Sequence, residues 1–139
     1  AAETGHLVFG TLHTSSAATT IDRLIDVFPP EQQTQIRIQL SNSLKAVLSQ
    51  TLMRKKDGQG RCMAMEIMTV TPAIGNLIRE GKTSQIYSAI QTGRKEGMQT
   101  LEAALAELYK QGLVRIDDIV AKSSRVDQLK NLLGAEIAV

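Results

Sequence analysis

The feature that most constrains the fold is a turn sequence, Asp57-Gly58-Gln59-Gly60, set between two runs of strand-forming residues. The runs cover residues 51–56 and 61–68, where the spacing of apolar side chains becomes shorter than a helix requires. An Asp-Gly pair between such runs is typical of the turn that joins two antiparallel strands. The sequence therefore predicts a β-hairpin in the middle of the chain.

The residues before the hairpin predict one strand and then two helices. The run 6–12 is short, mostly apolar and rich in strand formers, so we expect a buried strand there. The polar residues 13–16 supply a turn and helix N-cap candidates. The apolar stripe of a first helix follows at Ile21, Leu24, Ile25 and Phe28. Pro29-Pro30 ends that helix and opens a second, whose apolar positions we extend through Ile36, Leu40, Leu44, Val47 and Leu48.

The residues after the hairpin predict short helices. Pro72 opens a series over residues 73–80, 84–91, 98–111 and 117–122, with an apolar tail that contains Leu129, Leu132 and Leu133. The order of elements indicates an α/β fold: the edge of a sheet domain over residues 1–70, followed by a helical subdomain over residues 71–139.

Composition excludes several classes of protein. The 139 residues carry a net charge of +2, too close to balance to predict nucleic acid or membrane as a partner. The single cysteine, Cys62, excludes an internal disulfide, and we expect it to be a small core residue. No apolar run is long enough to cross a membrane. The chain enters an apolar run at once and has no initiator Met, so we expect it to be a piece of a longer protein.

One motif in the sequence imitates a phosphate-binding loop. Residues 76–83 end in Gly-Lys-Thr, but the loop requires glycine where Asn76 stands and a strand in front of it. Apolar residues at helical spacing precede the motif instead, so we interpret Gly81 as a helix C-cap.

The two histidines, His6 and His13, are the candidates for chemistry. An extended strand would place them about 20 Å apart and on opposite faces, so we expect no shared metal site. His13 lies where the expected strand gives way to a helix, a position at which α/β proteins bind anions. It could act on a phosphate there, or it could simply cap a turn.

Charged residues in and beside the hairpin have plainer interpretations. Four cationic residues, Arg54, Lys55, Lys56 and Arg61, flank the turn without aromatic neighbours for base stacking, so we interpret them as a solvated tip. Glu66 stands among apolar strand residues. It either faces water or is buried with a partner, for which Arg61 and Arg37 are the candidates.

Three segments carry a resemblance to a known family. Residues 1–14 resemble the histidine box of the type IV pilus and type II secretion ATPases, which in that family follows the Walker B strand. Residues 71–80 resemble the TPAIRNLIRE motif of the family's retraction branch, and residues 91–101 are similar to its QTG and GMQTL segments. The matches occur in the family's order and spacing and run from residue 1 to about residue 101.

The resemblance implies a RecA-like core in a cytoplasmic hexameric ring at the base of the pilus, with ATP and Mg²⁺ between subunits. A platform protein of the inner membrane is the implied partner, and nucleic acid is not. His13 and His6 would belong to the nucleotide-responsive box, and Thr11 and Thr14 would lie near the nucleotide. The residues implied in retraction output are Ala73, Ile74, Asn76, Leu77, Ile78, Arg79 and Glu80.

Two departures from the family pattern set further expectations. Gly75 replaces the arginine of the usual motif, which removes a positive charge and lowers helix propensity by about 1 kcal/mol. The Walker A loop, the acidic box and Walker B are absent, so we expect the 139 residues alone to bind no nucleotide tightly and to lack ATPase activity.

Two alternatives remain open. A pilus-assembly or type II secretion ATPase would carry a four-cysteine zinc module near the hairpin, where this chain has Cys62 alone. A non-enzymatic helical adaptor or regulatory module is the alternative from another class.

Overall fold

The computed structural model describes residues 1–134, and its twelve elements confirm a mixed α/β fold. Three are short 3₁₀ helices: η1 (Ala2–Thr4), η2 (Thr83–Gln85) and η3 (Arg94–Glu96). The others are α1 (Ala17–Asp26), α2 (Pro30–Ser43), β1 (Ala46–Arg54), β2 (Arg61–Thr69), α3 (Pro72–Arg79), α4 (Ile86–Thr92), α5 (Leu101–Lys110), α6 (Ile116–Lys122) and α7 (Val126–Leu133).

The hairpin of β1 and β2 is confirmed. The strands pair antiparallel from Ala46 opposite Thr69 to Arg54 opposite Arg61. Gly58 and Gly60 adopt φ angles of 74° and 83°, which other residues rarely adopt. The Asp57 carboxylate accepts a hydrogen bond of 2.8 Å from the Gln59 amide and so holds the turn in shape.

The first strand of the hairpin begins earlier than the sequence predicts. Val47 and Leu48, which we assigned to the second helix, belong to β1, because α2 ends at Ser43. Val47 lies opposite Met68 and is buried, whereas Leu48 is exposed. Alternation of buried and exposed side chains is the pattern of a strand. The apolar residues of β1 match the helical spacing of α2 only by coincidence.

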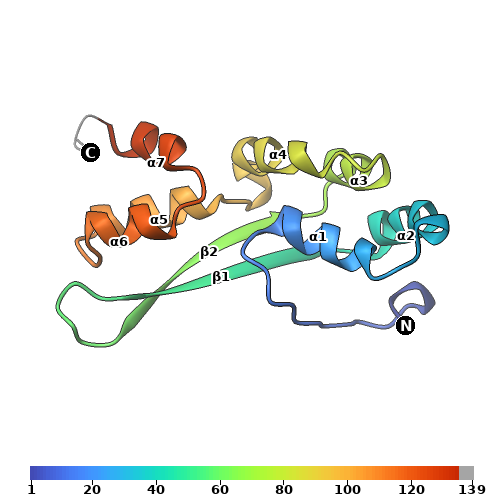
Figure 1. Ribbon diagram of the computed structural model, residues 1–139, viewed down its shortest axis with the longest axis horizontal. Coiled ribbons are helices and arrows are strands. Elements are labelled where there is room, and N and C mark those ends of the chain that lie inside the picture. Colours follow the sequence, from blue (N-terminus) through green and yellow to red (C-terminus); the bar gives the residue numbers. More distant parts are fainter. Residues whose placement is uncertain (135–139) are drawn as a thin grey trace.

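The prediction of a strand over residues 6–12 is also wrong. These residues form an extended segment without regular secondary structure before α1 (Figure 1). The side chains of Leu7 and Phe9 are 81% and 88% exposed. A strand needs a neighbour for its backbone hydrogen bonds, and within residues 1–134 the sheet consists of β1 and β2 alone.

Both strands of the hairpin contribute side chains to two hydrophobic cores. The first core joins α1, α3 and α4 to the end of the hairpin far from the turn, and it includes Ile21, Met68, Ile74, Ile78 and Ile90. The second core joins α5, α6 and α7 to the half of the hairpin near the turn, and it includes Met53, Ala64, Leu105, Ile119 and Leu129.

Candidate functional site

His13 lines an open hollow of about 610 Å³ at the start of α1. Ser16 caps this helix, because its hydroxyl accepts a hydrogen bond of 3.2 Å from the Thr19 amide. The rest of the lining comes from the segment before α1, from α1 and from β1, and comprises Leu12, Thr14, Ser15, Thr19, Asp22, Arg23, Asp26 and Gln50.

Thr14 is the anchored residue of the segment before α1. The Thr20 hydroxyl donates to the Ser16 carbonyl over 2.8 Å, so its oxygen is left to accept from the Thr14 hydroxyl at 2.6 Å. This bond ties the segment to the first turn of the helix. His13 is exposed, immediately before the anchor.

The structure does not bring every expected residue to this hollow. Thr11 is exposed and is not part of the lining. His6 lies near the N-terminus, where its Nδ1 is 3.0 Å from the Thr4 hydroxyl. That hydroxyl donates to the Ala1 carbonyl, so the ring N–H of His6 is the donor in the pair. The two histidines thus have different neighbours.

The hollow has a lining of mixed charge and is not a complete nucleotide site. Its lining combines Arg23 and His13 with the carboxylates of Asp22 and Asp26. No glycine-rich loop contributes backbone amides, so these residues do not form a cradle for a triphosphate. Residues 1–134 contain no group of three His, Cys, Asp or Glu residues that could hold a metal ion.

The motif expected to act in output forms α3 and has two different faces. Ile74 and Ile78 are fully buried in the first core. Leu77 is half-buried, and Ala73 is exposed. Asn76 is exposed, and its side-chain amide oxygen accepts a hydrogen bond of 2.6 Å from the Arg79 guanidinium. Glu80 pairs with Lys82 at 2.9 Å, and a hydrogen bond from that ammonium lowers the Glu80 pKa.

The Gly-Lys-Thr sequence after α3 is not a phosphate-binding loop. Gly81 has a φ angle of 71°, and its amide donates to the Ile78 carbonyl, as at the end of a helix. Thr83 begins the short helix η2. A helix rather than a strand precedes the motif, as we expected.

Glu66 is buried, and its partners are neither Arg61 nor Arg37. One carboxylate oxygen accepts from the amide of Ala17, the first residue of α1, over 2.9 Å. The other accepts from the amide of Leu101, the first residue of α5, over 3.4 Å. Burial raises the pKa of Glu66 despite these two bonds. Two helix N-termini thus share one carboxylate, in place of the arginine partner that we considered for a buried Glu66.

Glu102 is a second buried carboxylate, and no motif in the sequence predicts its role. It accepts hydrogen bonds from the Tyr87 hydroxyl at 3.2 Å, the Ser123 hydroxyl at 3.0 Å and the Arg125 amide at 3.2 Å. The Arg125 guanidinium lies over the Tyr87 ring, 3.9 Å from its centre. Burial first, and then the charge of Glu102, raise the pKa of Tyr87 to about 12. Glu102 therefore joins α4, α5 and the segment before α7.

Comparisons with known proteins agree on one family. The family described as Type II/IV secretion system protein matches residues 1–121. The type IV pilus retraction ATPase PilT of Pseudomonas aeruginosa is 63% identical over 114 residues, which are 82% of this chain and 33% of that protein. A twitching motility protein of Neisseria gonorrhoeae is 54% identical over 114 residues, 82% of this chain and 30% of that protein.

A solved structure has the same fold. The crystal structure of the pilus retraction motor PilT with bound ADP superimposes with a TM-score of 0.82 at 46% identity, covering 93% of this chain and 36% of that one. The chain thus spans about a third of the length of the curated relatives that it matches. None of the helices within residues 1–134 is long and apolar enough to cross a bilayer.

Proposed function

The chain belongs to the type II/IV secretion system protein family, and on that basis we propose that it is part of a motor ATPase that drives type IV pilus retraction. The support for retraction rather than assembly is the 63% identity to a retraction ATPase, together with a hairpin whose strands are joined by only six residues, 55–60, none of which is cysteine. The whole motor would hydrolyse ATP with Mg²⁺ as a cytoplasmic hexameric ring at the base of the pilus and would act on a platform protein of the inner membrane.

The observation that carries this proposal is the hydrophobic core that α1 and α3 share. His13 stands just before α1, and the output motif forms α3. Buried residues of both helices, Ile21 and Ile25 with Ile74 and Ile78, belong to one core. A displacement of α1 therefore reaches α3 through this core and through α2 and η2, which contact both helices, because close-packed side chains transmit strain.

In this proposal the chain divides the work between two regions. Residues 1–70 contain the nucleotide-responsive part, with His13, His6, Thr11 and Thr14, and residues 71–139 contain the output part, with the exposed face of α3 at Asn76, Arg79 and Glu80. The residues that hold the triphosphate must come from elsewhere in the full protein, since the hollow beside His13 does not fit it.

The test compares ATP hydrolysis by the full-length protein with that of the 139 residues alone. We expect turnover by the full-length protein, no turnover by the 139 residues, and a loss of about 100-fold in the full-length His13→Ala variant. Ser124→Ala, an exposed change remote from both helices, is the control. Turnover by the 139 residues that His13→Ala abolishes, or full activity in the full-length His13→Ala variant, would contradict the proposal.

A further inference from the structure

The turn end of the hairpin concentrates positive charge. Residues 54–61 carry four cations against the single carboxylate of Asp57, a formal charge of +3 where the whole chain has +2. Arg115, at the start of α6, adds a fifth cation beside them. We call these residues the basic tip: Arg54, Lys55, Lys56, Arg61 and Arg115.

The charge of the basic tip is not neutralised within the part of the chain that the structure describes. The ion pair within residues 1–134 is Lys82 with Glu80, far along the sequence from the tip. Asp57 is engaged in the turn, where it accepts from the Gln59 amide. Arg54 and Arg61 lie directly opposite each other at the end of the ladder. Like charges in that arrangement destabilise a hairpin, and an anion bound between them would relieve the repulsion.

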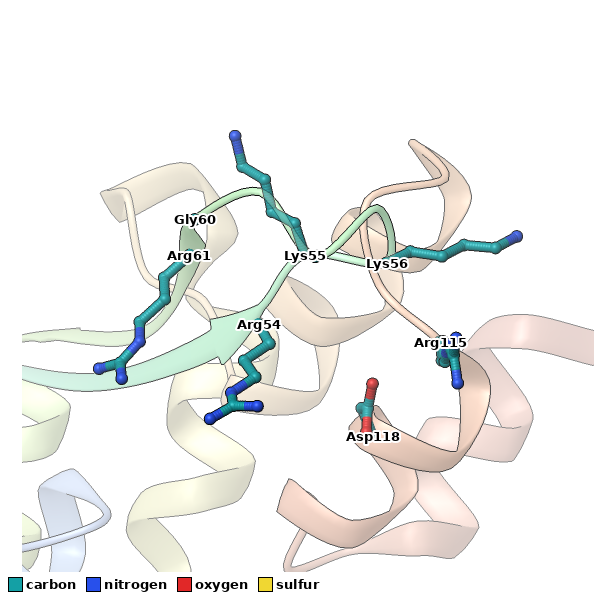
Figure 2. A pocket seen from close by; sticks show the side chains of 8 residues that line it. Arg54, Lys55, Lys56, Gly60, Arg61, Arg115 and Asp118 are labelled. Carbon is teal, nitrogen blue, oxygen red and sulfur yellow. The ribbon is translucent and has the colours of Figure 1, made fainter.

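The basic tip has a fixed backbone and a concave surface. The Lys56 amide donates to the Leu113 carbonyl over 2.8 Å, which ties the hairpin to the loop before α6. Between them lies a hollow of about 480 Å³, lined by the basic tip with Gly58, Gly60 and Asp118. Figure 2 shows Arg54 and Arg61 extending to the same side of the hairpin, while Lys55 and Lys56 point in other directions.

The composition of the lining selects among anions. It contains no aromatic side chain on which a nucleic-acid base could stack, and no large apolar side chain that could enter a bilayer. Asp118 also lines the hollow, so one carboxylate interrupts its cationic lining. Cations that point in several directions fit carboxylates spread along a peptide, and guanidinium groups bind carboxylates through paired hydrogen bonds.

We propose that the basic tip is a docking surface for an acidic segment of a partner protein. The same charges also discourage edge-to-edge pairing of the hairpin, a role that a carboxylate would fulfil equally well. Charge reversal therefore separates the two roles, because it preserves edge protection and removes the attraction for an acidic segment.

The experiment measures calorimetric binding of a hexaglutamate peptide with blocked ends to the 139-residue chain. We expect salt-sensitive binding that the double variant Lys55→Glu/Lys56→Glu weakens about tenfold. Arg115→Glu lies on a different element and should weaken it about threefold. The control is Lys45→Glu/Lys95→Glu, which changes the net charge equally but away from the tip, and which should bind as the parent does.

Three results would overturn the proposal. The first is the absence of peptide binding, or binding that the control variant weakens as much as the tip variant. The second is tighter binding of inorganic phosphate than of the peptide, which would assign the tip to a phosphate. The third is tighter binding of phosphatidylglycerol vesicles, lost in the tip variant, which would assign it to a membrane surface. Unfolding midpoints of all variants confirm that each one is folded.

Discussion

Replacing Gly75 with alanine tests whether α3 packs as the structure describes. Gly75 is the fourth residue of α3, and its amide donates to the Thr71 carbonyl over 2.8 Å. A methyl group added there would lie 3.5 Å from the Ser41 carbonyl oxygen and 3.9 Å from Cγ1 of Val70. Both are ordinary van der Waals distances, so the methyl fits without strain.

The expected gain follows from the helix and from the unfolded chain. Alanine is favoured over glycine by about 1 kcal/mol in a helix interior. The same substitution also lowers the conformational entropy of the unfolded chain, and measured gains in folding stability from this effect are about 0.4–1 kcal/mol. The methyl also lies against the Ser41 oxygen and reduces its solvation, which offsets part of the gain. We therefore expect Gly75→Ala to stabilise the fold by about 0.5–1 kcal/mol.

Urea unfolding followed by circular dichroism measures this gain. With a slope of about 1–3 kcal/mol per molar urea, the midpoint should rise by roughly 0.2–1 M. Gly97→Ala is the matched control, since Gly97 has a φ angle of 80° and nothing within 4 Å of an added Cβ. There the same methyl should cost about 1–2 kcal/mol, because the backbone is left-handed. A lower midpoint for Gly75→Ala would refute the described packing of α3 on α2.

Three further substitutions test the buried groups. Because the pKa of Glu66 is raised, its protonated form favours folding below the unfolded pKa of 4.5, and this stability is lost as the pH rises through the folded pKa. Urea midpoints should therefore fall from pH 4.5 towards neutrality in the parent and stay flatter in Glu66→Gln. Tyrosinate absorbance should show Tyr87 titrating near pH 12, and Glu102→Gln should lower that midpoint. Gly93→Ala should destabilise by about 1–3 kcal/mol, because its Cβ would lie 2.7 Å from the Met98 methyl and 3.0 Å from the Ala89 carbonyl oxygen.

Local chemistry made the hairpin and the helix starts predictable. The turn needs glycine at two left-handed positions, and Gly58 and Gly60 provide them. Ser16, one of the N-cap candidates among residues 13–16, caps α1, and Pro72 marks the start of α3. Residues 46–50 were misassigned because a short apolar run fits either period until its pairing partner is known.

Non-local contacts made the rest unpredictable. The run 6–12 has the composition of a strand, but a strand also needs a neighbouring edge, which the described residues do not supply. Glu66 finds its partners 49 and 35 residues away, in the backbone amides of two helices. The sequence does not show which backbone amides will lie near Glu66. Cationic side chains such as Arg61 and Arg37 are the partners that can be named from the sequence alone.

The position of Glu66 bears on how the two proposed regions communicate. The division into residues 1–70 and residues 71–139 follows the order of elements along the chain and stays a prediction. The packing divides the chain differently: α3 shares a core with α1, and α5 packs with the half of the hairpin near the turn. Glu66 lies in β2, one of the two strands that both cores share, and its carboxylate accepts hydrogen bonds from the first residues of α1 and α5. A shift of about 1 Å in the start of α1 would break its 2.9 Å bond to Ala17. The carboxylate would then remain buried with only the longer hydrogen bond of 3.4 Å to Leu101. Burial with so few hydrogen bonds costs free energy for a charged group. The starts of α1 and α5 are therefore both held by one side chain of β2, and α1 cannot move far without either carrying β2 with it or losing its bond to Glu66.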